Sequence, residues 1–458
     1  MKIYCFIFFL CLNSFKYNKI KKKNYYIIYE VFYRDFLPRL IIALRLSKKK
    51  NNVVLISLKK FIQLYTYLPP GIVLLKTANS NLNYFFQNLI NNKFILCVQD
   101  EEQLNLNNSS HNFYEKIIDK NIIKKIHTFF FWGKSQYDFF TKRLKIYKPG
   151  IISGSSKYDL VNNKFLYLYD NERIEIKKKY QKFILITSNF GDSTFPLKER
   201  SAINFAKAFE IKFDRKFENF WNEFYYSRRK VAFMLIDIIY KLEKEYNDMT
   251  IILRPHPSDN HNFWYKNLKQ SNRIKIEYEY SVNSWILESK LHLHHYCTTS
   301  IESFFLNKNS LCYSPFKYKN MLIDLYFKTS PIVKSYSEII KYLKKSLNNQ
   351  NFIIKKNAKF NNAIINNKKI LAYKKIADHL NKINIKKYNF SKFEKPLYYA
   401  WHITNVFFGF LLKFDKYNYN KSIKGLENKE LFFSELKKIK EFKKSNIKSV
   451  DKEIMTII

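Results

Sequence analysis

Glycine is scarce in this sequence: only 7 of 458 residues are Gly, where about 7% is usual. A chain that avoids glycine keeps it where a side chain would clash or where φ must be positive. Gly133, Gly150, Gly154 and Gly191 all lie at or just after apolar runs. They therefore predict loops at strand ends, which is where ligands sit in α/β sheets.

Cysteine is also sparse. Cys5, Cys11, Cys97, Cys297 and Cys312 are scattered, with neither CxxC spacing nor the spacing of a zinc site. This pattern argues against a disulfide framework and a structural metal, and it favours a reducing cytoplasm.

Apolar runs long enough to span a bilayer are not evident. Ile3–Leu12 is apolar and precedes Lys21, Lys22 and Lys23, but it is too short to span and has no small-residue cleavage site. We expect residues 1–23 to be an extension outside the fold. Trp401–Phe414 is also short, and we expect it to be a helix buried against the first domain.

Apolar and basic residues are abundant. The 47% hydrophobic and 18% aromatic content indicates a globular chain, and the length suits two domains plus an appendage. Lys and Arg exceed Asp and Glu by 81 to 38, a net charge of +43. Lysine is spread along the chain together with Asn and Ile, which indicates codon bias, so we expect no nucleic-acid partner. A basic surface still favours anionic donors and the cytoplasmic lipid face.

The first part of the chain alternates short apolar runs with amphipathic ones, which predicts a parallel sheet covered by helices. Arg34–Lys48 is its first expected helix, with Pro38 in the first turn. The expected strands are Tyr25–Tyr29, Val53–Ser57, Gly71–Lys76, Phe94–Val98 and Thr128–Trp132. We assign this domain to residues 24–165.

A polar stretch from Asn162 to Lys182 has no strand period, as in a linker, and a second αβ series follows over residues 180–350. Two successive parallel αβ domains predict two Rossmann-like domains facing each other, the GT-B architecture. Residues 351–458 form a Lys-rich region of helical pattern, a basic helical C-terminal extension. The second series has expected strands at Phe183–Thr187, Thr250–Leu253, Ile274–Ile276, Leu291–Leu293 and Leu311–Tyr313.

Three consecutive acids, Asp100, Glu101 and Glu102, follow the strand Phe94–Val98. Partial burial at the end of a strand would make one of them a general base. The alternative is a solvated acidic turn.

Arg254-Pro255-His256-Pro257 follows another expected strand. Its guanidinium and its proline-bracketed imidazole are suited to phosphate oxygens. The alternative is a turn whose prolines end the strand.

The segment Thr298-Thr299-Ser300-Ile301-Glu302 lies between an apolar run and a helical pattern. If Thr299 is the N-cap, Thr299 and Glu302 form a capping box. The hydroxyls of Thr298 and Ser300 then remain at a helix N-terminus, where phosphate is favoured.

Other features are weaker. In a strand, His292 and His294 fall on one face and His295 on the other, which argues against a metal site. The loop containing Asn189 and Gly191 would let backbone amides approach a ligand.

In order along the chain, these motifs resemble the family of surface carbohydrate biosynthesis proteins, whose members are similar to GT-B transferases. The resemblance covers residues 25 to 345. It is carried by Asp100-Glu101-Glu102, Trp132-Gly133, Gly154 with Asp159, Ser188 to Gly191, Arg254 to Pro257, Trp285, and Thr298 to Glu302.

The chain also distantly resembles bacterial polysialyltransferases that use CMP-sugars and CDP-glycerol glycerophosphotransferases. By that resemblance Glu101 or Glu102 activates the acceptor hydroxyl, His256 meets the donor phosphate, and Thr298 to Ser300 help to hold it. Alternatively, Glu302 binds the ribose of the nucleotide. Gln103 stands where that pattern has Gly, and Ser156-Lys157 where it has Pro-Arg.

The resemblance implies a metal-independent, inverting glycosyltransferase of capsule, O-antigen or lipopolysaccharide synthesis, without a cofactor. Its partners would be a nucleotide-activated sugar, with a CMP-linked acidic sugar favoured, and a glycan or lipid-linked acceptor. The expected location is the cytoplasmic face of the bacterial inner membrane. The alternatives are a CDP-polyol phosphotransferase, a nucleotide-sugar epimerase, and a non-catalytic basic protein that binds RNA or membranes.

Overall fold

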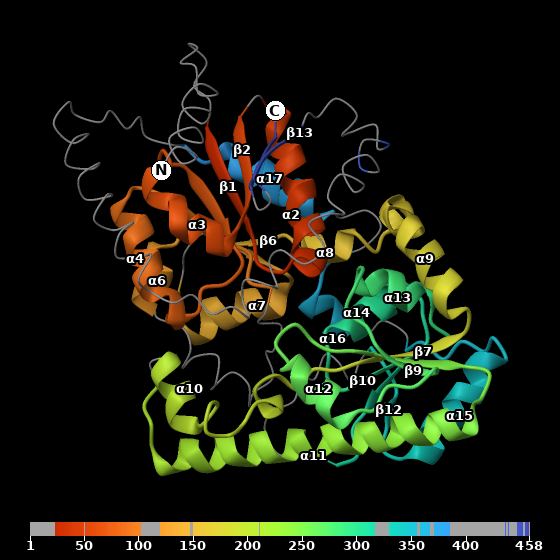
Figure 1. Ribbon diagram of the computed structural model, residues 1–458. Helices are drawn as coiled ribbons and strands as arrows, with labels where there is room; N and C mark the ends of the chain where they lie inside the picture. The colour runs from red at the N-terminus through yellow and green to blue at the C-terminus, as the bar shows by residue number, and fades with distance from the viewer. Residues whose placement is uncertain are drawn as a thin grey trace. The chain divides into compact units, whose positions relative to one another are not determined.

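The computed structural model describes residues 23–49, 51–101, 120–146, 150–209, 211–316, 329–354, 358–366, 371–384, 436, 438, 447–451 and 454–457. Glu102, residues 1–22 and Trp401–Phe414 lie outside these ranges. The described residues form two α/β sheets (Figure 1). The predicted α/β chain with two parallel-sheet domains is confirmed.

The first sheet has the strand order β13-β14-β2-β1-β3-β4-β5-β6. β1 pairs in parallel with both β2 and β3, and its side chains are buried on both faces from Tyr25 onward, as in a sheet covered by helices. The strands are β1 (Asn24–Tyr29), β2 (Asn52–Ser57), β3 (Ile72–Leu75), β4 (Ile95–Val98), β5 (Thr128–Phe131), β6 (Gly150–Ile152), β13 (Ile447–Asp451) and β14 (Ile454–Ile457).

Five of these strands were expected within one or two residues, whereas β6, β13 and β14 were not. β14 pairs antiparallel with β2, so the end of the basic C-terminal region, expected to be helical, contributes strands to the first sheet. The helices between the parallel strands are α2 (Phe32–Ser47), α3 (Leu58–Leu64), α4 (Asn83–Asn91), α6 (Lys120–Lys125), α7 (Lys134–Asp138) and α8 (Ser156–Asp159).

The position expected for Pro38 is wrong. Because α2 begins at Phe32, Pro38 is its seventh residue and lies inside the helix, beyond the first turn. It is buried there, and the missing N–H removes one hydrogen bond from the helix ladder.

The second sheet has the order β12-β11-β10-β7-β8-β9, with every pair parallel. Its strands are β7 (Phe183–Thr187), β8 (Thr250–Arg254), β9 (Ile274–Ile276), β10 (Leu291–His294), β11 (Ser310–Tyr313) and β12 (Ile332–Val333). Its helices are α9 (Asp170–Tyr180), α10 (Ala202–Ala208), α11 (Arg215–Glu245), α12 (His261–Asn267), α13 (Val282–Glu288), α14 (Thr299–Phe305), α15 (Tyr336–Leu347) and α16 (Ala358–Ala363).

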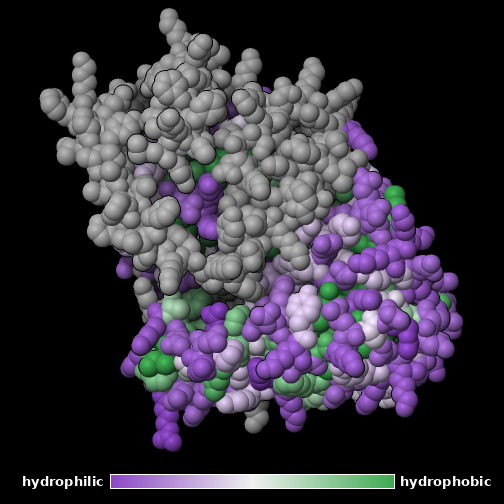
Figure 2. Space-filling view, in the orientation of Figure 1, coloured by the Kyte–Doolittle hydropathy of each residue, from purple (hydrophilic) through white to green (hydrophobic). Residues whose placement is uncertain are grey.

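The side chains of successive residues of β7 point to opposite faces of this sheet. Ile184 and Ile186 pack in a core that includes apolar residues of α11, α12 and α15. Phe183 and Leu185 pack instead with residues of α9 and α13. Hydrophilic side chains cover much of the described surface in the view of Figure 2, in keeping with the lysine-rich sequence.

The stretch expected to be a linker is helical over most of its length. Within it, α9 buries Glu172, Ile176 and Tyr180, and it packs against α13. Apart from Glu172, the charged residues that hid this helix from the hydrophobic pattern are not buried.

The described residues divide into two compact units, one with those in 23–75, 88–97 and beyond 372, the other with those in 76–87 and 98–372. Within the first unit, α17 (Ala372–Lys382) packs near the start of the first sheet. Lys23 Nζ donates to the carbonyls of Asn381 and Ile383, each at 2.7 Å, and Arg45 pairs with Asp378 at 3.1 Å. A helix thus returns to the first unit.

Candidate functional site

The second sheet has a topological switch point at β7. The chain runs outward from β7 through β8 and β9, then returns to place β10 on the other side of β7. In open α/β sheets, ligands bind beyond the carboxyl ends of the strands at such a point. The loops that follow β7, β8 and β10 carry Asn189, His256 and Thr298 respectively.

One buried carboxylate joins the loops after β7 and β8. Asp259 Oδ1 accepts from the amides of Phe190 (3.0 Å) and Gly191 (2.7 Å). Its Oδ2 accepts from Ser188 Oγ (2.6 Å) and Trp264 Nε1 (3.1 Å). Asp259 is fully buried, and that burial raises its pKa against the opposing effect of the four donors.

Sequence analysis missed Asp259. A polar residue three positions after a conspicuous histidine looks like an ordinary turn former. The available signal was its position in His256-Pro257-Ser258-Asp259, two residues before α12, in which Trp264 is the fourth residue. Three of its four donors come from the loop after β7, 68 to 71 residues earlier in the chain, so no local pattern identifies it.

His256 is fixed through its backbone and one ring nitrogen. Its amide donates to Ser188 Oγ at 2.8 Å, and its carbonyl accepts from the Asp259 amide at 2.9 Å. The ring Nδ1 accepts from the Ser258 amide at 3.1 Å. Since Nδ1 is an acceptor, the neutral imidazole carries its proton on Nε2.

Arg254 lies at the end of β8 and is 6% exposed. Its guanidinium donates to the carbonyls of Glu279 (2.6 Å) and Tyr280 (2.5 Å) and lies over the Tyr278 ring. These contacts hold the loop after β9. The role expected for Arg254 at a donor phosphate stays a prediction.

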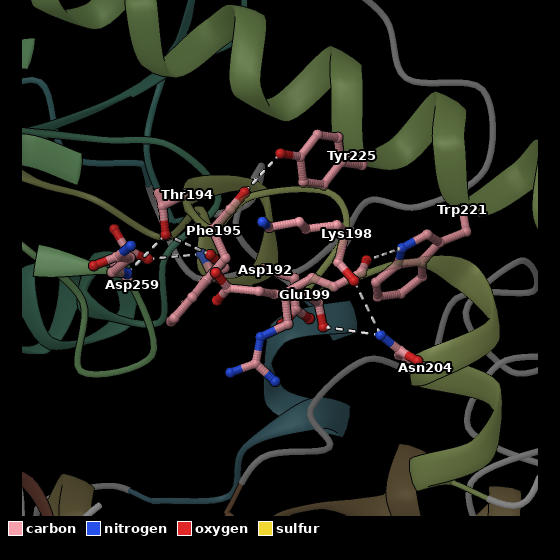
Figure 3. Close-up of polar contacts among 12 residues, drawn as sticks. Asp192, Thr194, Phe195, Lys198, Glu199, Asn204, Trp221, Tyr225 and Asp259 are labelled. Atoms are coloured by element: carbon pink, nitrogen blue, oxygen red, sulfur yellow. Dashed lines mark hydrogen bonds and ion pairs between the residues drawn. The ribbon is translucent and has the colours of Figure 1, made fainter. Parts of the chain in front are cut away.

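The loop after β7 is held on both sides, and Figure 3 shows the side on which Tyr225 contacts Phe195. Asn189 donates through Nδ2 to the Tyr296 carbonyl at 2.7 Å, which connects this loop to the end of β10. On the other side, Tyr225 of α11 donates to the Phe195 carbonyl (2.6 Å), and Trp221 to the Arg200 carbonyl (2.8 Å). Gly191 has φ +50°, in the left-handed region that favours glycine.

The capping box expected at Thr299 and Glu302 is wrong. Helix α14 begins at Thr299, and its N-cap is Thr298, whose side chain makes no capping hydrogen bond. The Thr299 hydroxyl instead lies 2.9 Å from Thr187 Oγ1 on β7. Tertiary partners on the sheet compete successfully with the local cap.

The other hydroxyls of this segment differ in surroundings. Ser300 is fully buried and accepts from Thr329 Oγ1 at 2.9 Å. Thr298 is partly exposed at the helix start. The phosphate role expected for Thr298, Thr299 and Ser300 stays a prediction.

Glu302 is completely buried and pairs with a lysine from α8. Its Oε1 lies 2.5 Å from Lys157 Nζ, with the lysine side chain 12% exposed. Its Oε2 has no hydrogen-bond partner among the described residues. Tyr158, Ile301 and Phe304 belong to the apolar cluster around this region. A buried carboxylate with one cation and an unused oxygen is costly unless something further binds it.

The three histidines occupy the end of β10 as neutral, buried groups. His292 is hydrogen-bonded to two hydroxyls: its Nε2 lies 2.8 Å from Thr187 Oγ1, and its Nδ1 lies 2.7 Å from Ser303 Oγ. His295 lies 2.7 Å from the Tyr313 carbonyl and stacks on Phe190. Burial lowers the pKa of His294 and of His295 to about 3. Among the described residues, no group of three or more His, Cys, Asp or Glu side chains could hold a metal ion.

The acids of the first sheet follow β4. Asp100 and Glu101 are 2% and 9% exposed, and the Glu101 amide donates to the Lys76 carbonyl at 3.1 Å. These side chains are therefore well shielded from water, unlike a solvated turn. Glu102 lies outside the described residues.

Gln99 connects the acidic segment to the loop after β6. Its Nε2 donates to the Gly154 carbonyl at 3.2 Å. Gly154 has φ +83°, and a Cβ there would lie 2.6 Å from Asn366 Oδ1. Asn366 in turn donates to Asp159 at 2.8 Å. The loop needs glycine both for its backbone conformation and for the close approach of Asn366.

The described contacts bring together the loops after β7, β8 and β10. The segment that contains Asp100 and Glu101 bonds to the loop after β6 through Gln99 and to Lys76 after β3 through the Glu101 amide. The convergence of both groups on one cleft stays a prediction.

No protein-family model matches this chain, and no curated protein matches it. Among solved structures, S. aureus MnaA in a co-structure with UDP has a TM-score of 0.49 and 13% identity, over 81% of this chain and all of MnaA. The Methanocaldococcus jannaschii UDP-GlcNAc 2-epimerase with UDP-GlcNAc and UDP has a TM-score of 0.45 and 14% identity, over 79% and 99%. The wall teichoic acid polymerase TagF has a TM-score of 0.42 and 11% identity, over 79% and 88%. At these scores the likeness assigns no activity to this chain.

Proposed function

We propose that this protein transfers a sugar from a nucleotide-activated donor to a glycan or lipid-linked acceptor during synthesis of a bacterial surface polysaccharide. The observation that carries the proposal is the arrangement at the switch point of the second sheet. There, loops from three adjacent strands present His256, Asn189 and Thr298 and are joined by hydrogen bonds. A phosphate-linked ligand suits this edge of an α/β sheet.

His256 is the proposed ligand of the donor phosphate. In the neutral ring Nε2 carries the proton, since Nδ1 accepts from the Ser258 amide, so Nε2 has a hydrogen to donate to a phosphate oxygen. Thr298 and Thr299 would add hydroxyl contacts, and Glu302 would contact a ribose hydroxyl through Oε2. Arg254 and Lys157 add positive charge beside the leaving nucleotide.

The proposed base is Glu101, with Glu102 and Asp100 as the other candidates. In an inverting transfer it removes the proton from the acceptor hydroxyl. The hydroxyl oxygen then bonds to the anomeric carbon while the bond from that carbon to the donor phosphate oxygen breaks. Glu101 is 9% exposed, so little water competes with the acceptor hydroxyl for this carboxylate. We favour a metal-independent reaction with a CMP-linked acidic sugar as donor.

Binding of the nucleotide tests this proposal directly. We expect CMP or a CMP-sugar to raise the melting temperature of the protein by a few degrees at saturating concentration, because ligand bound to the folded state alone stabilises it. His256→Ala should remove most of that rise while the unliganded melting temperature changes little. His127→Ala, an exposed histidine beside β5, is the matched control and should behave as the wild type.

Other outcomes distinguish the alternatives. A rise with UDP-sugars alone, with release of a 2-epimer, would favour an epimerase, and a rise with CDP-polyols would favour a phosphotransferase. No rise with any of these nucleotides would contradict the proposal. Loss of the fold in His256→Ala, without a selective binding defect, would make His256 a structural residue.

We also propose attachment to the cytoplasmic face of the inner membrane through basic residues. Across the described part of the chain, no helix is both long and apolar enough to cross a bilayer. Each Lys or Arg close to an anionic surface contributes about 1 kcal/mol, and salt screens this attraction. High salt should therefore release the protein from membranes. A protein that is free of membranes at low salt, or that needs detergent for release, would contradict this attachment.

A further inference from the structure

The loops after β7 and β8 are connected by one buried side chain, that of Asp259. Asp259 is buried completely and accepts four hydrogen bonds, from Ser188, Phe190, Gly191 and Trp264. Two of the donors are backbone amides of the loop after β7, and one is an indole N–H of α12. A carboxylate with acceptor capacity for all four is the residue type that this site requires.

Asp259 reaches His256 by two short routes. The Ser188 hydroxyl donates to Asp259 Oδ2 at 2.6 Å and accepts from the His256 amide at 2.8 Å. The Asp259 amide also donates to the His256 carbonyl at 2.9 Å. The His256 amide is therefore linked to the carboxylate through Ser188, and the His256 carbonyl is bonded to the backbone of Asp259 itself.

We propose that Asp259 is a positioning residue that fixes the loops after β7 and β8 to each other and thereby orients the His256 imidazole. This proposal rests on the proposed function for its consequence in nucleotide binding, but the orientation itself can be measured without any nucleotide. Asp259 acts through His256 and does not contact the ligand.

The substitution Asp259→Asn tests the role with almost no change in shape. If the amide oxygen keeps the bonds from Phe190 and Gly191, the new NH₂ group faces Trp264 Nε1, so two donors oppose each other. Ser188 donates to Asp259 in the wild type, and its hydroxyl can turn to accept from that NH₂ group instead. The conflict is therefore confined to Trp264, and the double variant Asp259→Asn/Trp264→Phe removes it.

The first measurement uses the full-length protein without ligand. The imidazole Cε1–H resonance of His256 is identified by its loss in His256→Ala and followed by NMR with histidine labelling. We expect this resonance to shift or broaden in Asp259→Asn and to return toward its wild-type position in the double variant. Asp248→Asn, which removes an exposed carboxylate just before β8, is the control and should leave it unchanged. An unchanged His256 resonance in a folded Asp259→Asn protein overturns the proposal.

The second measurement is a double-mutant cycle on nucleotide binding, with CMP as the probe. Asp259→Asn should weaken binding about tenfold, the size expected when one buried donor loses its acceptor. In the His256→Ala background the same change should have little further effect, because the two residues act in series. Additive losses mean that Asp259 is only structural and overturn the proposal. If CMP does not bind the wild type while the NMR result holds, the proposed function fails and the positioning role stands.

Discussion

The buried pair of Lys157 and Glu302 allows a stability prediction with a definite size. Glu302 is fully buried, and Lys157 Nζ lies 2.5 Å from its Oε1. The substitution Lys157→Met keeps most of the side-chain volume but leaves the carboxylate without its cation. Breaking a buried pair from one side costs about 3–5 kcal/mol. That is a large part of the roughly 5–15 kcal/mol that stabilises a typical domain.

Removing both charges should reverse most of this loss. The surrounding cluster contains Tyr158, Ile301 and Phe304, so methionine at both positions would find apolar neighbours. Buried pairs replaced by apolar residues are often neutral or stabilising. We expect Lys157→Met/Glu302→Met to unfold at a urea concentration close to that of the wild type.

The assay is urea denaturation followed by circular dichroism, with the slope compared between variants so that midpoints can be interpreted. Lys178→Met, an exposed lysine on α9, is the control and should change stability by less than about 0.5 kcal/mol. A loss below about 1 kcal/mol in Lys157→Met would refute the argument. So would a double variant as unstable as the single one.

Two further predictions concern backbone strain and pH. Gly154→Ala should destabilise the protein by about 1–3 kcal/mol in the same assay, because φ +83° and Asn366 at 2.6 Å both oppose a Cβ; an unchanged midpoint would contradict this. Glu172 should make the wild type lose stability as pH rises. Burial raises its pKa from 4.5 to about 7, so the folded state binds more protons than the unfolded state between those values. The stability that depends on this group is fully present below pH 4.5. As pH rises from 4.5 to 7, the free energy of unfolding falls by about 3 kcal/mol, at 1.36 kcal/mol per pKa unit. Glu172→Gln should abolish this component of the pH dependence, and a variant with the wild-type pH profile would show that Glu172 does not cause it.

Hydrophobic periodicity alone located much of the fold. Runs such as Val53–Ser57 and Phe183–Thr187 are apolar on both faces because helices cover both sides of a parallel sheet. Each strand can therefore be recognised from its own residues. Two of the scarce glycines, Gly154 and Gly191, marked loops where φ is positive, whereas Gly150, also expected in a loop, is the first residue of β6. Strands β6, β12, β13 and β14 were not predicted: β12 has only two residues, and β14 pairs with β2, which lies near the other end of the chain.

The sequence by itself determined that strands end shortly before Asp100, at about Arg254 and shortly before Thr298, and it thereby singled out the loops that carry the candidate site. Only the tertiary structure decided how these residues are used. Glu302 pairs with Lys157 and not with a local cap, Arg254 holds carbonyls of the loop after β9, and Asp259 joins the loops after β7 and β8. The physical reason is the same in each case. A buried charge or donor must find its partner within about 3 Å, and chain segments that are distant in sequence supply that partner only after the sheet has formed.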